Sequence, residues 1–205
     1  MVLYLSIILI SMGIIMLFNC LFGGYVFDYN ILWVIISTTM CVIVEIALQG
    51  LVAFIIHSCP DKWFINKKIF NVSNGERKFY DRLKIKKWKD KVFELCALGG
   101  FRKNKVKHPS DVDYLKLFII ESNKGIFIHI FGAIVGAAVL FVLPFQYIFR
   151  ITLYVWLVGA FLAILPIFVL RYNMPKLQAG YKRALNLQKR HDSIEVDSLN
   201  NACLW

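Results

Sequence analysis

Two ionisable side chains, Glu45 and His129, stand inside long apolar stretches of this sequence. A charged group inside a bilayer is costly, so such a residue is a functional candidate by default. Gln49 follows Glu45 by one helical turn, and the two side chains can hydrogen-bond on one face of a helix. Glu45 is therefore either a protonated or paired structural residue or a group that contacts a substrate.

His129 precedes a row of small residues, Gly132, Ala133 and Gly136, on the same helical face. Small residues allow close helix packing in lipid, so we expect His129 to face protein or a cavity and not the acyl chains. A neutral imidazole there can accept the proton of an attacking hydroxyl, the task of a general base in acyl transfer. The alternative is a histidine that only hydrogen-bonds a neighbouring helix.

Glu121 is a candidate carboxylate partner for His129. On a continuous helix the two residues lie about 12 Å apart along the axis and roughly 80° apart around it, so they cannot touch. A relay between them needs a break in the helix, for example at Gly125, or a substrate that spans both. Otherwise Glu121 acts on its own at the membrane interface.

A second pairing lies in the segment "HPSDVD" at 108–113. His108 and Asp113 have the His-x-x-x-x-Asp spacing in which many glycerolipid acyltransferases pair a base with a carboxylate. Pro109 disturbs the backbone between them and the usual apolar flanks are missing, so this pair is a secondary hypothesis.

A basic stretch at 84–101 has the sequence "KIKKWKDKVFELCALGGF". In helical register one side carries Ile85, Trp88, Val92 and Leu95 and another carries Lys84, Lys87 and Lys91. This pattern predicts a helix in the headgroup layer with Trp88 at the interface. The alternative is a solvated amphipathic helix packed on the loop's own core. Lysines interleaved with aromatic residues also suit nucleic acid, but anionic lipid headgroups are the simpler partner beside membrane spans.

Arg171 opens the segment "RYNMPKL" at 171–177. Its guanidinium can pair with a phosphate or carboxylate at the membrane edge, where Tyr172 can anchor, and Pro175 is expected to end the membrane span. The alternative is a plain positive stop after a membrane span.

The elements that must position these residues are membrane spans. The 205 residues are 59% hydrophobic and their mean hydropathy is +0.61. A helix needs about 20 mostly apolar residues to cross a bilayer, and four segments qualify: Val2–Phe22, Ile31–Ile56, Gly125–Leu143 and Ile151–Leu170. We predict an all-α integral membrane protein with two spans in 1–56, a basic loop with an interfacial helix in 57–124, two spans in 125–170 and a tail in 171–205. The part of this tail after Arg190 has no clear helical period, so we expect it to be loosely ordered.

Positive charge sets the predicted orientation. Seventeen of the 24 Lys and Arg lie between His57 and Lys124, six follow Leu170, and only Arg150 lies elsewhere. Lys and Arg concentrate on the cytoplasmic side, so we expect the loop and both termini in the cytoplasm. The first apolar stretch lacks a basic n-region and exceeds an ordinary signal-peptide core, so we expect it to be retained.

Several chemistries are excluded by missing motifs. The five cysteines form no Cys-x-x-Cys pair, which argues against a disulfide scaffold or a zinc site. The chain has no Gly-rich phosphate loop, His-Glu-x-x-His or Gly-x-Ser-x-Gly, so the commonest ATPase, metalloprotease and serine-hydrolase classes do not apply.

Between Cys59 and Leu177 the chain carries, in order, "CPDKWF", "KIKKWKDKVFELCALGGFRK", "ESNKGIFIH" and "RYNMPKL". This set resembles the glycosyl-4,4'-diaponeurosporenoate acyltransferase family. Members are small bacterial membrane proteins, and the name-giving activity esterifies a sugar hydroxyl of a glycosylated carotenoid with a fatty acyl group, the last step of staphyloxanthin synthesis. The resemblance therefore implies a location in a bacterial plasma membrane.

The family's motifs fall on particular residues of this chain. They are Lys86, Trp88, Lys89 and Asp90; Gly99, Gly100, Phe101 and Lys103; Glu121 and His129; and Arg171, Tyr172, Asn173 and Pro175. The chain departs from the family at Phe93, where proline is usual, and at Lys124 and Ile126, where the family has arginine and a second acid.

The resemblance implies a membrane acyltransferase that moves a fatty acyl group from acyl-CoA or acyl carrier protein to a lipid-linked sugar, with no metal or other cofactor. His129 would take the hydroxyl proton, and Glu121 or Asp90 would orient the base or the acceptor. The Gly99–Gly100 turn would approach the oxyanion. The residues that would bind substrate are Lys86, Lys87, Trp88, Lys89, Gly99, Gly100, Lys103, Arg171, Tyr172 and Asn173. Two other classes stay open: a non-catalytic lipid-binding or assembly subunit, and a small lipid transporter that depends on Glu45.

Overall fold

The structure is a computed structural model that describes residues 2–22, 30–65, 67–92 and 108–202. Within these ranges every regular element is helical. The α-helices are α1 (Val2–Phe22), α3 (Ile31–Ser58), α4 (Asn74–Arg82), α5 (Ile85–Trp88), α6 (Val112–Gly136) and α7 (Leu153–Ala202).

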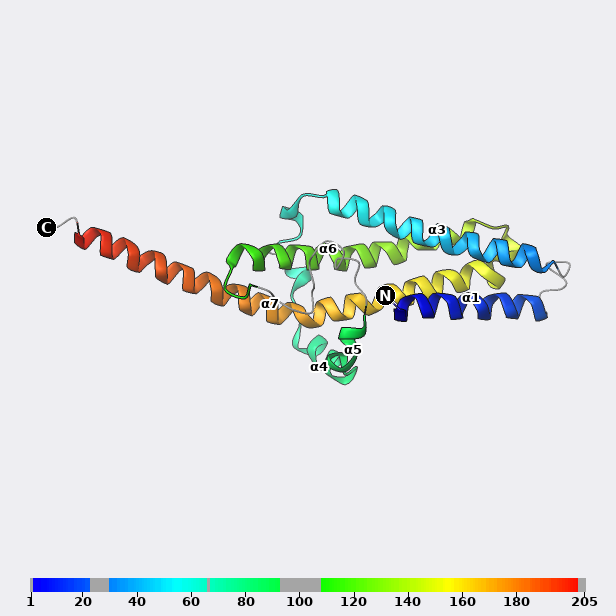
Figure 1. Ribbon diagram of the computed structural model, residues 1–205, viewed down its shortest axis with the longest axis horizontal. Coiled ribbons are helices and arrows are strands. Elements are labelled where there is room, and N and C mark those ends of the chain that lie inside the picture. The colour runs from blue at the N-terminus through cyan, green and yellow to red at the C-terminus, as the bar shows by residue number, and fades with distance from the viewer. Residues whose placement is uncertain (1, 23–29, 66, 93–107, 203–205) are drawn as a thin grey trace.

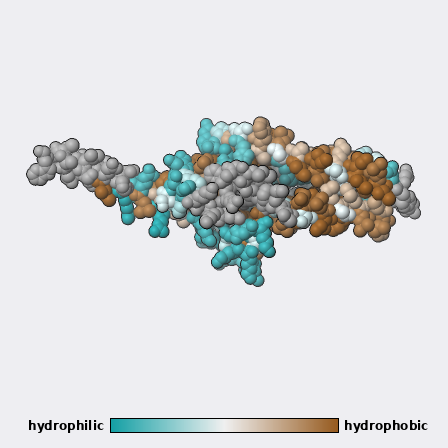
Figure 2. Space-filling view, in the orientation of Figure 1, coloured by the Kyte–Doolittle hydropathy of each residue, from teal (hydrophilic) through white to brown (hydrophobic). Residues whose placement is uncertain are grey.

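Four of these helical segments are long and apolar enough to cross a membrane, as predicted. They run along the long axis of the molecule, and α7 extends beyond the others toward the C-terminus (Figure 1). Apolar surface gathers over the end that holds α1, and polar surface gathers over the middle, where α4 and α5 lie (Figure 2). We call the end where α3 ends and α6 begins the loop-bearing end.

The apolar end has an exposed hydrophobic surface of the kind that belongs in lipid. Large side chains on several helices are mostly exposed, among them Leu9, Ile14, Ile43 and Phe141. A soluble protein rarely exposes apolar patches of this extent to water. Because each helix satisfies its own backbone groups, hydrocarbon can surround these faces at little cost.

Helix α6 begins earlier than predicted. The third span was expected from Gly125, but α6 begins at Val112 and passes through Gly125 without a break. Asp111 starts it, since its carboxylate accepts a hydrogen bond from the Tyr114 N–H at 2.9 Å. After Gly136 the chain continues as a 3-10 turn to Phe141, close to the predicted end of the span.

Helix α7 corrects a prediction about the C-terminal part. The tail after Arg190, expected to be loosely ordered, is helical to Ala202, and the helix also continues through Pro175, where we expected the membrane span to end. Proline removes one helical hydrogen bond, but packing against another helix can compensate for it. Here Leu170, Met174 and Leu177 are buried against Phe118 and Ile126 of α6.

The basic loop contains a shorter amphipathic helix than expected. Helix α5 covers only Ile85–Trp88, and a 3-10 turn over Lys89–Lys91 follows it. Ile85 and Val92 of the predicted apolar side are buried in a cluster with Tyr80 and Val169, so the loop packs on α7. Leu95 of the same predicted side lies outside the described residues.

The long helices pack against one another around a common interior. Helix α6 packs against both α7 and α3, and α1 packs against α3 and α7. At the end opposite the loop, the Asn19 side chain donates to the Arg150 carbonyl at 2.8 Å, which joins α1 to the short turns before α7. The interior that remains between α1, α3, α6 and α7 holds the candidate site.

Candidate active site

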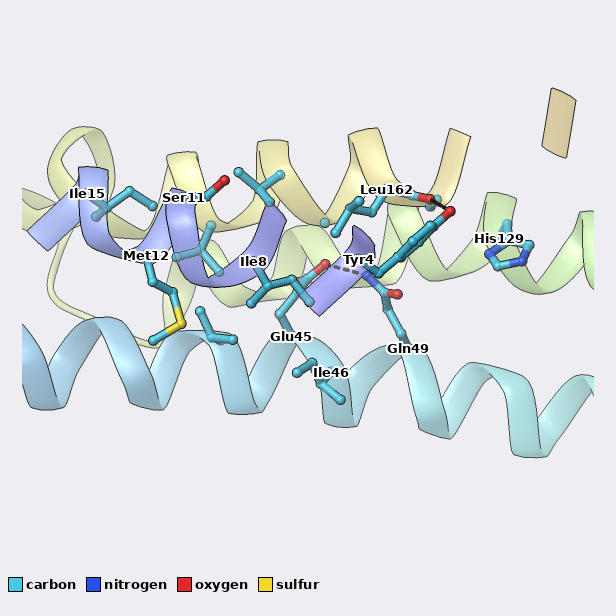
Figure 3. Close-up of a pocket in the computed structure, with 15 residues that line it drawn as sticks. Tyr4, Ile8, Ser11, Met12, Ile15, Glu45, Ile46, Gln49, His129 and Leu162 are labelled. Atoms are coloured by element: carbon cyan, nitrogen blue, oxygen red, sulfur yellow. Dashed lines mark hydrogen bonds between the residues drawn. The ribbon is translucent and has the colours of Figure 1, made fainter. Parts of the chain in front are cut away.

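A cavity of about 160 Å³ lies inside the apolar end of the bundle. Residues of α1, α3, α6 and α7 line it, and most of them are aliphatic. The polar side chains in its wall are Tyr4, Ser11, Glu45, Gln49 and His129, and Figure 3 shows them between the helices. Such a lining suits an apolar ligand that carries a few polar groups.

Glu45 and Gln49 form the predicted hydrogen-bonded pair. Gln49 Nε2 donates to Glu45 Oε1 at 3.0 Å, and Glu45 is 4% exposed. Its second oxygen has no hydrogen-bond partner within the described part of the chain. A buried polar atom of this kind is costly without a partner, so a ligand hydroxyl or a water can bond to it.

Glycines make room for this pair. A Cβ added at Gly136 of α6 or at Gly159 of α7 would lie 2.5 Å from Glu45 Oε1, closer than real Cβ contacts. A Cβ at Gly132 would lie 3.6 Å from Gln49 Cγ. The small residues after His129 therefore allow the close helix packing that the sequence predicted, with α3 as the partner.

His129 lines the cavity, as its position beside small residues predicted. The ring lies near Tyr4 and away from Ile15, which places it at the loop-bearing end of the cavity (Figure 3). Tyr4 is held there because its hydroxyl donates to the Leu162 carbonyl at 3.3 Å. A half-buried imidazole beside a membrane cavity has the surroundings that a general base for a lipid hydroxyl needs.

Glu121 does not pair with His129. Because α6 is continuous through Gly125, the break that a direct relay would need is absent. The Glu121 carboxylate instead lies 3.7 Å from His57 Nδ1 and 3.6 Å from Lys124 Nζ. Lys124 is buried and also contacts Asp61 at 2.6 Å, so Glu121 belongs to a charge cluster at the loop-bearing end.

Arg171 forms the strongest contact between the loop and the helices. Its guanidinium forms a two-point ion pair with Glu76 of α4, including a 2.9 Å bond from Nη2 to Oε2, and donates to the Ile69 carbonyl at 3.1 Å. Hydrogen bonds from Arg171 lower the pKa of the Glu76 carboxyl, and burial raises the pKa of Tyr80, which donates to Glu76. Arg171 thus fastens α4 to α7.

Two predicted substrate-binding segments meet beside this ion pair. Lys89 Nζ donates to the Asn173 side-chain oxygen at 3.5 Å and lies 6.0 Å from the Tyr172 ring centroid. Trp88 packs into the same cluster as Tyr172, and the Tyr4 side chain also contacts this cluster. Because Tyr4 lines the cavity too, the basic segment lies next to the cavity's loop-bearing end.

Other predicted site residues lie apart from this arrangement. Lys86, Lys87 and Asp90 are exposed. His108 and Asp113 are also exposed, and His108 rests edge-on against Tyr114 with ring centroids 5.3 Å apart. No contact that the structure describes joins His108 to Asp113, and Asp111 between them caps α6. Gly99, Gly100 and Lys103 lie outside the described residues.

Sequence reasoning missed His57, Asp61 and Glu76. Their partners lie far along the chain, and no local spacing connects them. Among the described residues no group of three His, Cys, Asp or Glu side chains is placed to hold a metal ion.

Comparison with known proteins places the chain in a family. Residues 60–183 match the family described as glycosyl-4,4'-diaponeurosporenoate acyltransferase. No curated protein and no solved structure matches the chain. The matched region contains the loop motifs, Glu121, His129 and the Arg171 segment, and it covers more than half of the 205 residues. The chain therefore belongs to the glycosyl-4,4'-diaponeurosporenoate acyltransferase family.

Proposed function

We propose that this protein esterifies a sugar hydroxyl of a glycosylated carotenoid, or of a similar glycolipid, with a fatty acyl group from a thioester. Family membership supports acyl transfer. The single observation that carries the mechanism is the position of His129, which belongs to the matched region and lines a mostly apolar cavity at its loop-bearing end. A lipid-borne hydroxyl can reach such a site from the bilayer.

In the proposed reaction the His129 imidazole accepts the proton of the sugar hydroxyl as the oxygen attacks the thioester carbonyl. A tetrahedral intermediate forms, its carbon–sulfur bond breaks, and the thiolate leaves with the proton that the imidazolium returns. The products are an ester and a free thiol. Glu121 has no contact with the ring, so its proposed role is at the interface, within the cluster of His57 and Lys124.

The orientation is proposed from charge. The loop-bearing end carries the lysine-rich segment, and positive residues concentrate on the cytoplasmic side of bacterial membranes. The acyl donor, acyl-CoA or acyl carrier protein, would approach from the cytoplasm. The acceptor lipid would enter from the bilayer.

The test is an assay of the purified full chain in lipid nanodiscs with radiolabelled acyl-CoA and a panel of glycolipids, including a glycosylated carotenoid. We expect an acyl ester with the wild type, and at least a 100-fold lower rate with His129→Gln, the usual size of a general-base contribution. His108→Gln, at an exposed site outside the cavity, should keep its activity. Absence of ester with every acceptor, or full activity of His129→Gln, would overturn the proposal.

The other two classes predict different outcomes. A lipid-binding or assembly subunit gives no ester and keeps its function in His129→Gln. A transporter gives no ester either, but its activity depends on Glu45 and on a transmembrane gradient, because Glu45 is the buried carboxylate in the cavity. Measuring the His129→Gln and Glu45→Gln variants side by side distinguishes all three.

A further inference from the structure

A second cavity lies at the loop-bearing end, outside the apolar part of the bundle. Its volume is about 500 Å³, and it is bounded by α6, by the part of α7 that follows Arg171, and by the loop residues between Ile65 and Asn71. None of its lining residues lines the cavity that contains His129. It is therefore a separate site.

Positive charge dominates this second cavity. Its wall contains four lysines from three different segments: Lys67 and Lys68 of the loop, Lys116 of α6 and Lys182 of α7. None of the described residues that line it is acidic, and the structure describes no ion pair for these four lysines. Four unneutralised ammonium groups around one cavity repel one another, so an anion in the cavity relieves that repulsion.

Uncharged hydrogen-bonding groups lie in the same wall. Asn71, Asn123 and Gln178 each contribute a carboxamide. Asn123 is 1% exposed and its side-chain N–H donates to the Phe64 carbonyl at 2.7 Å, while its own oxygen has no partner within the described part of the chain. A fixed and unsatisfied acceptor of this kind suits a ligand that has an N–H or hydroxyl donor as well as negative charge.

We propose that this cavity binds the phosphate-bearing part of the acyl donor and that the donor is acyl-CoA. This inference rests on the proposed function, because it names the donor for that reaction. Coenzyme A carries three phosphate groups, and its pantetheine arm supplies amide N–H groups and a hydroxyl. Four lysines fit several phosphates better than the single phosphodiester of an acyl carrier protein's prosthetic group.

The positions along α6 are compatible with this assignment. Lys116 and Asn123 precede His129 on the continuous helix by about 20 Å and about 9 Å along the axis, and they lie roughly 140° and 120° away from it around the helix. An extended pantetheine arm reaches roughly 15 Å from its phosphate to its sulfur, by the rise per bond of an extended chain. In the proposed complex the arm starts beside Asn123 and passes around α6, which brings the thioester to the loop-bearing end of the first cavity while the phosphates stay in the second.

The experiment measures the binding of free coenzyme A to the purified full chain in nanodiscs of neutral lipid. We compare the wild type with Lys116→Gln/Lys182→Gln and with a control, Lys78→Gln/Lys189→Gln, which removes the same charge from exposed lysines outside the cavity. We expect the cavity variant to raise Kd about tenfold and the control to change it by less than about twofold. Added salt should weaken binding by the wild type.

Competition by four probes identifies the source of the phosphate. Pantetheine without phosphate should not compete with coenzyme A, and dephospho-coenzyme A should compete weakly. The inference is overturned if both double variants bind coenzyme A equally, if pantetheine competes as well as coenzyme A does, or if anionic-lipid nanodiscs or holo acyl carrier protein displace coenzyme A at low concentration. Displacement by anionic-lipid nanodiscs would assign the lysines to a lipid headgroup, and displacement by holo acyl carrier protein would assign them to a carrier protein.

The same variants keep this inference separable from the proposed function. If the cavity variant forms ester and binds coenzyme A as tightly as the wild type, only the assignment of the second cavity as the coenzyme A site is overturned. If the protein binds coenzyme A tightly but forms no ester with any acceptor, the proposed acyltransferase function is overturned and the coenzyme A site is retained.

Discussion

The packing of Glu45 between two glycines gives the most demanding test of this structure. Replacing Gly159 with alanine places a Cβ 2.5 Å from Glu45 Oε1 and 3.2 Å from Gln49 Nε2. Either the carboxyl moves away and weakens its 3.0 Å bond with Gln49, or the helices α3 and α7 separate. Both responses disturb the cavity wall that contains His129.

Two opposing terms set the size of the effect. Alanine is a better helix former than glycine by roughly 0.5–1 kcal/mol, which favours the variant. Overpacking a close contact costs typically about 1–3 kcal/mol. We therefore expect Gly159→Ala to lower the free energy of unfolding by about 1 kcal/mol, the difference between the midpoints of these two ranges. Gly136→Ala/Gly159→Ala should cost more than the sum of the two single variants, because Glu45 Oε1 is equally close to both positions and has nowhere to move.

The assay is reversible unfolding by SDS in mixed micelles, followed by tryptophan fluorescence. Gly50→Ala is the matched control, since a Cβ there meets nothing within 4 Å and only the propensity gain remains. In the Glu45→Ala background the 2.5 Å contact is gone, and Gln49 Nε2 no longer has a bond to Glu45 that holds it 3.2 Å from the new Cβ. Gly159→Ala should therefore become neutral or stabilising. If Gly159→Ala destabilises the protein equally with and without the Glu45 carboxyl, the packing argument is wrong.

Further expectations concern the ion pair between α4 and α7. Arg171→Gln leaves the Glu76 carboxylate partly buried and without its ion pair. We therefore expect the unfolding free energy, measured without substrate, to fall by about 2–3 kcal/mol. A variant that loses activity but keeps full stability would instead make Arg171 a substrate ligand. Because the folded-state pKa of Glu76 is depressed, its stabilisation is complete above the unfolded pKa of about 4.3 and is lost as the pH falls below that value. Unfolding midpoints of the wild type should fall faster below that pH than those of Glu76→Gln, and parallel curves would contradict the assignment. Lys89→Gln removes the 3.5 Å bond to Asn173 and should change the unfolding free energy by less than about 1 kcal/mol. If the basic segment binds the acyl donor, the same variant should raise the KM for the donor. An unchanged KM would show that Lys89 does not bind the donor.

Long apolar stretches were sufficient to predict the four spans, because a helix that crosses lipid needs little beyond length and hydrophobicity. The Glu45–Gln49 pair and the position of His129 beside small residues also followed from helical spacing alone. The ends of α6 and α7 did not, because they depend on the Asp111 cap and on the burial of Met174 against α6. Tertiary packing outweighs the local signal of a proline such as Pro175.

Long-range charge pairs were beyond sequence reasoning for a different reason. Glu76 and Arg171 are 95 residues apart, and their pairing depends on how the loop folds back on α7. His57 lies at the end of α3 and meets Glu121 only because α3 packs beside α6. Spacing rules connect residues within one helix, so they could exclude a direct contact of Glu121 with His129 on a continuous α6 but could not identify His57 as its neighbour.

An enzyme that joins a water-soluble thioester to a membrane lipid must hold two ligands that prefer different solvents. This chain separates the two environments along α6, with Lys116 and Asn123 in the basic cavity and His129 at the apolar one. A single helix fixes their spacing, and α6 packs against α3 and α7 along this stretch. If the two cavities serve one reaction, a break in α6 should uncouple them. Ile128→Pro would remove the hydrogen bond to the Lys124 carbonyl and kink the helix between Asn123 and His129, so it should reduce ester formation far more than coenzyme A binding. Equal loss of both would indicate unfolding, and Ile128→Leu, which keeps the helix, should preserve both ester formation and coenzyme A binding.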